Sequence, residues 1–280
     1  MELPEIDTPL KVCISGDIDD FNIETIERLK PYISILDKYG IRATFFITAK
    51  AAEDYPERVE YLLKNNQVVE GHGDVHKAFY EPEPIQVDRL NAMKATFSRI
   101  FDLEIEGFRA PFYQHNDATY LAVDKAGLKY DCSKKRFEIA FKGIPFVQKK
   151  YMYTRTYPYT KPLLKLVGFL YNTYCKSPRI PYRITKNVIE FPTLGISDYS
   201  LIGDPRGPRY RPEEAIKIGE IWIECLNSFK QGGDGVLTLQ VHPGRVSPMY
   251  LESLDYFIQH ALQLDAVFST PSDLIKDVGE

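Results

Sequence analysis

The chain has 280 residues and a formal net charge of −4, so the overall charge points to no particular class of partner. Hydrophobic residues make up 44% and charged residues 26%, which is typical of a globular protein with a core and excludes a disordered chain. No apolar run approaches the roughly 18–20 residues that span a bilayer, and the first residues lack a secretory pattern. We therefore expect a cytoplasmic protein without a membrane-spanning segment.

The cysteines support the same compartment. Cys13, Cys132, Cys175 and Cys225 are widely spaced and form no C-x-x-C pair. Disulfides are rare in the reducing cytosol. We expect four reduced thiols.

Short apolar runs alternate with longer amphipathic segments along the first half of the chain. The pattern predicts strands at 11–15, 42–48 and 67–71, extended segments at 105–112 and 128–133, and helices at 23–40, 51–65, 85–101 and 117–127.

The second half continues the alternation. It predicts strands at 187–193, 236–241 and 266–270, helices at 212–230 and 248–264, and a short terminal helix. Repeated β-then-α units predict an α/β fold with about seven parallel strands, either a barrel or a doubly wound sheet. In both architectures the functional residues gather at the C-terminal ends of the strands.

Polar motifs follow five of these segments. They are GDIDD (16–20), GHGDVH (71–76), RAPF (109–112), DCS (131–133) and HPG (242–244). Each has an ordinary interpretation by itself, such as a helix cap for an Asp-rich turn, a satisfied core histidine or a structural ion pair. Their joint occurrence at successive strand ends favours one active site.

The residue types suit a metal-dependent hydrolase. His72 and His76 are four residues apart, so a helical turn or a tight loop would place both imidazoles on one side. Two imidazoles and one carboxylate leave a coordination position for water, as in catalytic zinc sites. Asp17 and Asp19 share a face of an extended backbone, so one can bind the metal and the other can act as a base.

These motifs resemble those of the polysaccharide deacetylases, carbohydrate esterase family four, which carry the NodB-homology domain. The resemblance runs from residue 11 to about 270 and is strong at GHGDVH (71–76) and GFRAPF (107–112). LKYDCS (128–133), VIEFP (188–192) and LQVHP (239–243) also match, and SGDIDDF (15–21) matches more loosely. The resemblance implies an irregular (β/α) barrel of about seven parallel strands.

The resemblance also implies a divalent metal ion held by Asp19, His72 and His76. This chain is similar to the branch of the family with a D-x-D motif, with Asp20 as a rival to Asp19. Zinc is the expected ion, and cobalt, nickel or iron would suit two histidines and one aspartate.

The implied reaction is hydrolysis of an N-acetyl or other N-acyl group on an amino sugar, by attack of metal-activated water. Asp17 would be the base and His242 the acid that protonates the leaving amine. Arg109 would orient Asp17, and the backbone N–H of Phe112 would stabilise the oxyanion. Asp131 resembles a residue that supports the site from behind.

The middle of the chain departs from the family. The usual Asp-and-Trp motif is not evident, and the one Trp, Trp222, lies in a predicted helix where core packing is expected. Residues 134–186 resemble an insertion in an otherwise single catalytic domain, 1–280, and contain thirteen Lys or Arg, seven Tyr and one acid, Glu138.

Three interpretations of this insertion stay open. It can pack on the barrel, bind an anionic membrane surface through residues 142–186, or form a groove for an anionic ligand. Nucleic acid is not expected, because no known nucleic-acid-binding fold accompanies the charge. The membrane interpretation suggests a lipid-linked or phosphate-bearing glycan precursor as the substrate, met at the inner face of the membrane.

Two other functions compete with the deacetylase. One is a cyclic-amide hydrolase similar to the allantoinase-like relatives, which share the D-x-D branch. The other is a non-catalytic glycan-binding module, which the retained Asp17, Asp19, Arg109 and His242 disfavour.

Overall fold

The computed structural model describes residues 10–20, 24–136, 180–195, 197–198, 215–231, 235–246 and 250–278. The strands in these ranges are β1 (Lys11–Ile18), β2 (Thr44–Ile47), β3 (Val68–Gly71), β4 (Gly107–Phe108), β5 (Tyr130–Asp131), β6 (Lys135–Arg136), β7 (Tyr182–Arg183), β8 (Ile189–Glu190), β9 (Thr193–Leu194), β10 (Val236–Gln240) and β11 (Val267–Phe268). The helices are α1 (Ile26–Lys38), α2 (Ala49–Asp54), α3 (Pro56–Lys64), α4 (Glu83–Phe101), the 3₁₀ turn η1 (Pro111–Tyr113), α5 (Asp117–Lys125), α9 (Ala215–Gln231), α10 (Pro243–Val246), α11 (Leu251–Gln263) and α12 (Pro271–Val278).

The strands form one curled, mostly parallel sheet. Its order is β6-β9-β10-β1-β2-β3-β4-β5-β8-β7, with β11 also paired to β1, and β7 is antiparallel to β8. Strands β8 and β9 belong to one short stretch of chain, yet β8 pairs with β5 and β9 pairs with β10. This stretch therefore joins the two ends of the sheet, and the predicted irregular (β/α) barrel is confirmed.

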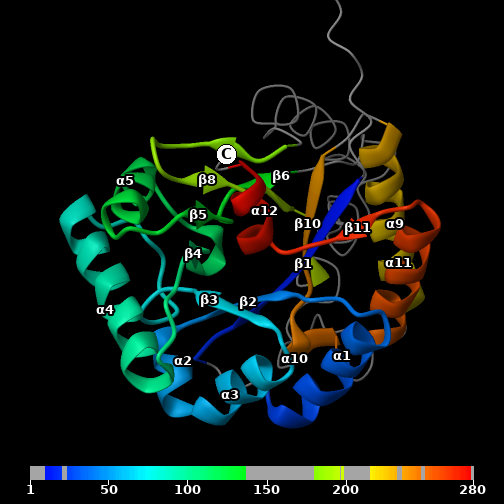
Figure 1. Ribbon diagram of the computed structural model, residues 1–280, viewed down its shortest axis with the longest axis horizontal. Helices are drawn as coiled ribbons and strands as arrows, with labels where there is room; N and C mark the ends of the chain where they lie inside the picture. Colours follow the sequence, from blue (N-terminus) through cyan, green and yellow to red (C-terminus); the bar gives the residue numbers. More distant parts are fainter. Residues whose placement is uncertain are drawn as a thin grey trace, which may run out of the picture.

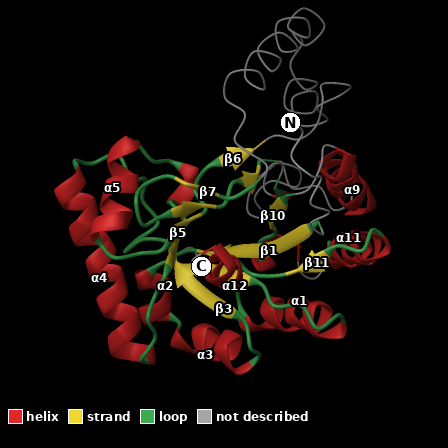
Figure 2. Cartoon of the chain, turned by 45° about the horizontal axis from the view of Figure 1, so that its top comes forward, coloured by secondary structure: helices red, strands yellow, loops and turns green. Residues whose placement is uncertain are grey.

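The helices surround the sheet. In Figure 1, α4 and α5 lie on one side, α9 and α11 on the opposite side, and α1, α2 and α3 along a third. Figure 2 shows the same ring of helices around the strands, with α12 over the middle of the sheet. The large outer core fills the space between helices and strands, with Trp222 of α9 and Phe257 of α11 fully buried in it. Trp222 therefore packs in the core, as predicted.

A second, smaller core occupies the inside of the barrel. It consists of Cys13, Phe46, Tyr130, Cys132, Ile189, Phe191 and Leu274. Leu274 comes from α12, so this helix closes the barrel at the end from which β1 enters. The polar motifs lie at the opposite end of the barrel, where the strands end.

Three predicted elements differ from the structure. The single strand predicted over 187–193 is divided into β8 and β9, which pair with different strands. The single helix predicted over 51–65 is wrong, because the chain breaks at Tyr55 and Pro56 begins α3. Proline is favoured at the first position of a helix and unfavourable inside one, which explains the break. Strand β1 also runs past Ser15 to Ile18, because Ser15–Ile18 pair in register with Thr44–Ile47 of β2.

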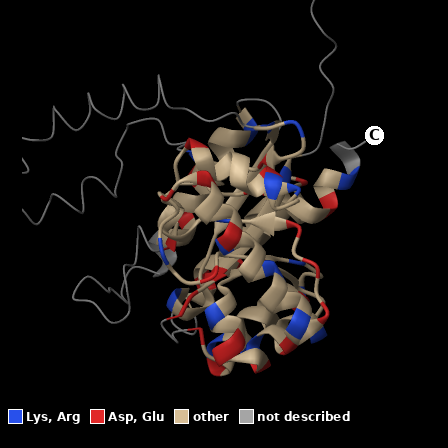
Figure 3. Cartoon of the chain, turned by 90° about the vertical axis from the view of Figure 1, so that its left-hand side faces the viewer, with Lys and Arg blue, Asp and Glu red and all other residues tan. Residues whose placement is uncertain are grey.

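The described part of the chain also shows where its charged residues and cysteines lie. In the view of Figure 3, the positions of Lys and Arg along the backbone are interspersed with those of Asp and Glu. Cys13 and Cys132 are buried free thiols and Cys225 is also buried, whereas Cys175 lies outside the described residues. In the part of the chain that the structure describes, no helix has the length and apolar character needed to cross a membrane. Of the predicted insertion, residues 137–179 lie outside the described ranges.

Candidate active site

The predicted residues come together at one end of the barrel. Asp17 lies near the end of β1, His72 follows β3, Arg109 follows β4 and His242 follows β10. These strands run parallel, so their C-terminal ends meet at the same edge. Along β1, alternate residues face the barrel interior: Cys13 packs in the inner core, and Ser15 and Asp17 continue that face into the site.

Asp17 and Arg109 form a buried ion pair. Arg109 Nη1 donates to Asp17 Oδ1 at 2.7 Å, and Nη2 donates to Ser15 Oγ at 2.8 Å and to Thr193 Oγ1 at 3.2 Å. The guanidinium is fully buried and lies over the ring of Phe46, at the top of the inner core. Its donors are thus committed to fixed partners. The arrangement is the one expected for a residue that orients Asp17.

The electrostatics keep Asp17 ionised. Burial by itself would raise the pKa of Asp17, but the Arg109 guanidinium, with His72 and His242 nearby, holds that pKa well below its usual value. His72 Nε2 and His242 Nε2 lie 3.7 and 3.8 Å from Asp17 Oδ2. A carboxylate in this state can accept a proton at neutral pH.

His72 is held in one tautomer. Its Nδ1 lies 2.7 Å from the carbonyl oxygen of Arg109, which can only accept a hydrogen bond, so Nδ1 carries the proton. Burial lowers the pKa of His72, which favours the neutral ring. The Nε2 atom is buried and has no hydrogen-bond partner. A neutral imidazole with a fixed tautomer and an open Nε2 is the form that binds metal ions.

His76 and Asp19 lie beside His72. The rings of His72 and His76 have centroids 5.3 Å apart, and His76 Nδ1 is 3.9 Å from Asp19 Oδ2. Burial, followed by the nearby His72, lowers the pKa of His76 to about 4. The rival Asp20 ties two loops together instead: it accepts from the backbone N–H of His76 and from the hydroxyl of Thr48. Asp19 is thus the carboxylate that the structure pairs with the His76 ring.

The imidazole and carboxylate groups of this cluster are ligand types that divalent cations bind. The buried Nε2 of His72, which has no hydrogen-bond partner, is the atom best suited to bind such a cation. In the described residues, however, no group of three His, Cys, Asp or Glu side chains is gathered closely enough to hold a metal ion. The pairs Asp19–His76 and His72–Asp17 stand at 3.9 and 3.7 Å. The metal site with Asp19, His72 and His76 remains a prediction.

Asp198 is a site residue that the sequence interpretation missed. It is fully buried and receives both the backbone N–H of His242, at 2.9 Å to Oδ2, and the ring Nδ1 of His242, at 2.7 Å to Oδ1. A search just past each strand would have found it, because Asp198 lies four residues beyond Leu194, the end of β9.

The loop after Arg109 has an unusual backbone. Phe112 and Tyr113 both have φ of 58°, a left-handed conformation that is costly for residues other than glycine. The Phe112 ring is 52% exposed and tilts against His76 with centroids 4.2 Å apart. The predicted oxyanion donor therefore sits in a strained turn directly beside His76.

Asp131 supports this loop indirectly. Asp131 Oδ1 accepts from the backbone N–H of Ser133, and Ser133 Oγ accepts from the backbone N–H of Ala110 at 2.8 Å. The sequence interpretation gave no role to Glu190, which is fully buried next to Asp131. Burial raises the pKa of both carboxyls, and the proximity of Asp131 raises that of Glu190 further. Both carboxyls therefore hold a proton more tightly than exposed carboxyls do.

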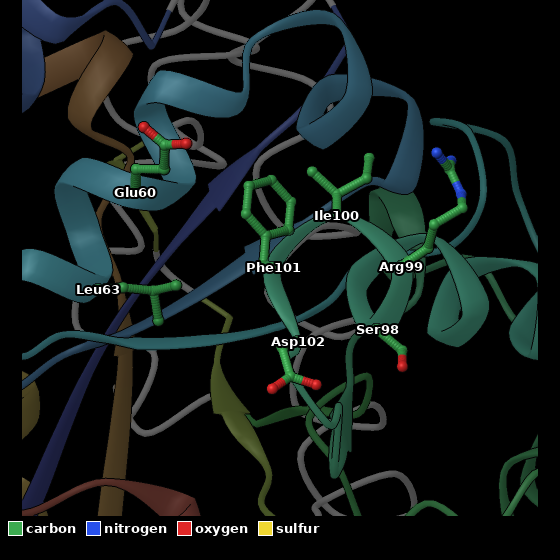
Figure 4. Close-up of a pocket in the computed structure, with 7 residues that line it drawn as sticks. All are labelled: Glu60, Leu63, Ser98, Arg99, Ile100, Phe101 and Asp102. Atoms are coloured by element: carbon green, nitrogen blue, oxygen red, sulfur yellow. The ribbon is translucent and has the colours of Figure 1, made fainter.

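A surface groove of about 670 Å³ lies away from this cluster (Figure 4). It is lined by Glu60 and Leu63 of α3 and by Ser98, Arg99, Ile100, Phe101 and Asp102 at the end of α4. None of the residues predicted for the active site lines it.

Comparisons with known proteins agree with the motifs. Residues 18–130 match the family model for polysaccharide deacetylase. A search of curated proteins finds no match. Solved structures share the fold at low sequence identity, and at such identity the likeness concerns the fold alone.

Three of these structures illustrate the range. A protein from Mycobacterium smegmatis assigned to the polysaccharide deacetylases is 17% identical, with a TM-score of 0.75, covering 99% of this chain and 92% of its own. One from Pseudomonas aeruginosa PAO1, also assigned to the polysaccharide deacetylases, is 12% identical, with a TM-score of 0.69 and coverage of 95% and 90%. Puue allantoinase is 11% identical, with a TM-score of 0.68 and coverage of 95% and 89%. The resemblance to the polysaccharide deacetylases is thereby confirmed, in sequence over residues 18–130 and in fold over the described chain.

Proposed function

We propose that this protein is a metal-dependent hydrolase that removes an N-acetyl or other N-acyl group from an amino sugar. The observation that carries the proposal is the environment of Asp17. This one carboxylate is bound by Arg109 and lies within 4 Å of both His72 and His242. Residues from three other motifs therefore surround a single ionised base.

In the proposed mechanism, Asp17 takes a proton from water as the water attacks the amide carbonyl. His242 acts in its imidazolium form: it gives the proton on Nε2 to the nitrogen of the leaving amine and returns to the neutral ring, while Asp198 holds the ring through Nδ1. Arg109 keeps Asp17 ionised and oriented. The backbone N–H of Phe112 donates to the oxygen of the carbonyl as negative charge develops on it.

Asp19, His72 and His76 would hold the divalent cation, with zinc the expected ion. When bound, such an ion polarises the amide carbonyl and makes water a better nucleophile. The fixed tautomer and open Nε2 of His72 support its place in this set. Asp131 supports the loop that carries Phe112, through Ser133 and Ala110.

The decisive assay is release of acetate from a panel of N-acetylated amino sugars and oligosaccharides, with Asp17→Asn as the inactive control. We expect turnover by the metal-loaded wild type and loss of turnover in the variant, at unchanged folding. The same preparation is tested on cyclic imides and ureides, because the likeness to Puue allantoinase in fold keeps a cyclic-amide hydrolase as the second candidate. Hydrolysis of the cyclic amides alone would select that candidate.

A non-catalytic glycan-binding module is the third possibility. It predicts that the folded, metal-loaded protein binds an acetylated glycan without cleaving any substrate of either panel. The retained contacts of Asp17, Arg109 and His242 support an enzyme instead.

The place of the enzyme in the cell is part of the proposal. We treat residues 1–280 as one catalytic domain of a cytoplasmic protein, with the basic segment 134–186 as an insertion. Its charge supports contact with anionic membrane lipid and a lipid-linked or phosphate-bearing substrate. Flotation with liposomes tests this: we expect binding with anionic lipid at low salt, and no binding there rejects membrane contact.

A further inference from the structure

Gln240 links the proposed base to the proposed acid. It is the last residue of β10 and is 3% exposed. Its neighbours Leu239 and Val241 are buried in the outer core, so Gln240 and His242, two residues apart, face the barrel interior together. The strand thus delivers an amide and an imidazole to the same side of the site.

One nitrogen of Gln240 reaches both groups. Gln240 Nε2 donates to Asp17 Oδ2 and lies 3.1 Å from His242 Nε2. Asp198 accepts a hydrogen bond from His242 Nδ1–H, so in the neutral ring Nε2 is an acceptor. The two hydrogens of the amide therefore satisfy two lone pairs, one on each of the groups that move protons.

Asp17 and His242 form no direct hydrogen bond with each other. Asp17 Oδ2 and His242 Nε2 are 3.8 Å apart, which is beyond hydrogen-bond distance. Arg109 holds the other oxygen of Asp17, and Asp198 holds the far side of the His242 ring. Gln240 occupies the remaining position between them and closes the chain of contacts from Arg109 to Asp198.

We propose that Gln240 is a positioning residue that sets the separation of Asp17 and His242 through its amide nitrogen. Its kinetic consequence rests on the proposed function. In amide hydrolysis the base serves the incoming water and the acid serves the leaving nitrogen, and both of these atoms are bonded to one carbon in the tetrahedral intermediate. Two groups that act on neighbouring atoms lose rate steeply when their spacing changes.

The polarity of residue 240 matters as much as its size. Gln240→Leu keeps a similar volume and removes both donors. Gln240→Glu keeps the shape but presents an acceptor to Asp17, whose charge repels it. Gln259→Leu is the matched control, because Gln259 donates to Asp255 on the exposed surface of α11.

The first test needs no substrate. In ¹⁵N-histidine-labelled protein, the His242 Nε2 resonance is assigned by its loss in His242→Asn. We expect it to shift in Gln240→Leu and to stay in place in Gln259→Leu, with the Nδ1–H tautomer kept in both. A folded Gln240→Leu protein with an unmoved Nε2 signal overturns the proposal.

The second test uses turnover. We expect kcat to fall about 10- to 100-fold in Gln240→Leu, and further in Gln240→Glu, with KM changed less than about threefold. In an Asp17→Asn background the same Leu substitution should add less than about threefold, because the partner it positions is already disabled. An unchanged kcat, or a loss that adds fully to that of Asp17→Asn, overturns the proposal.

The two tests separate this inference from the proposed function. If the His242 Nε2 resonance shifts in Gln240→Leu but the wild type cleaves no N-acyl sugar, the Gln240 bridge is supported and the deacetylase is rejected. An unmoved resonance in an active deacetylase rejects the bridge alone.

Discussion

Asp198 binds His242 at two points, the backbone N–H and the ring Nδ1, with one oxygen of its carboxylate for each. The two contacts fix both the strand end and the ring, so the imidazole cannot rotate without losing a bond to a fully buried charge. His242 Nε2 consequently stays on the side of Asp17 and Gln240.

Replacing this carboxylate tests its importance. In Asp198→Asn, the amide can accept from only one of the two donors of His242, and its NH₂ group faces the other. We expect kcat to fall about 10- to 100-fold, as for other residues that orient a functional histidine. Steady-state kinetics and thermal unfolding measure the two effects, with Asp54→Asn on the surface as the control. An unchanged kcat would show that His242 needs no partner.

Metal analysis separates ligand from base. Asp17→Asn should keep its metal and lose about 10²- to 10⁴-fold in kcat, because the general base is gone. His72→Ala should lose both metal and turnover, since its open Nε2 is a proposed ligand. Elemental analysis of the purified proteins measures the metal content. A wild type that purifies without metal and cannot be loaded would contradict the assignment.

Arg109 should matter for stability as well as for activity. In Arg109→Met the buried Asp17 loses its cation, which typically destabilises a fold by about 3–5 kcal/mol. Urea unfolding measures the change. The double variant Arg109→Met with Asp17→Asn should recover part of that loss, since the buried charge is then removed. A cost that does not shrink in the double variant would assign it to packing of the Arg109 side chain instead.

The acid pair beneath the loop predicts a pH dependence. Burial, and then Asp131, raise the pKa of Glu190 above its ordinary 4.5 in the folded state. The folded state therefore binds this proton more tightly, so its contribution to stability is complete below pH 4.5 and is lost as the pH rises toward the folded-state pKa. One such group changes the free energy of unfolding by at most about 1.4 kcal/mol per pH unit.

Glu190→Gln removes the titrating group at nearly the same shape. We expect its free energy of unfolding to fall less steeply than that of the wild type as the pH rises above 4.5. Chemical denaturation at several pH values measures the difference, and Glu60→Gln on the surface is the control. Parallel curves for wild type and Glu190→Gln would show that the pair does not hold an extra proton.

Much of the fold could be predicted because local patterns and final structure agree. The predicted segments at 42–48, 67–71 and 236–241 became β2, β3 and β10 with small changes at their ends. The extension of β1 through Gly16 and Asp17 could not be read locally, because those residues disfavour strands. It depends on pairing with β2, and a Cβ on Gly16 would meet the carbonyl of Val241 at 2.9 Å.

The site was predicted in its residues more than in its contacts. Motif spacing pointed to Asp17, Arg109 and His242, and the structure brings these three together. Asp198 was missed because it lies four residues beyond the end of β9 and outside every motif that was recognised, and only the folded sheet brings it to His242. Gln240 was missed because an amide carries no motif of its own.

Arg109 contributes to the site with both its backbone and its side chain: its carbonyl oxygen accepts from His72 Nδ1, and its guanidinium donates to Asp17. One residue thus couples the tautomer of a proposed ligand to the charge of the proposed base. Transplanting this chemistry to another barrel would therefore require the backbone conformation at position 109 as well as the side chains. An arginine grafted onto a different backbone would not hold His72 Nδ1, and the imidazole ring could flip.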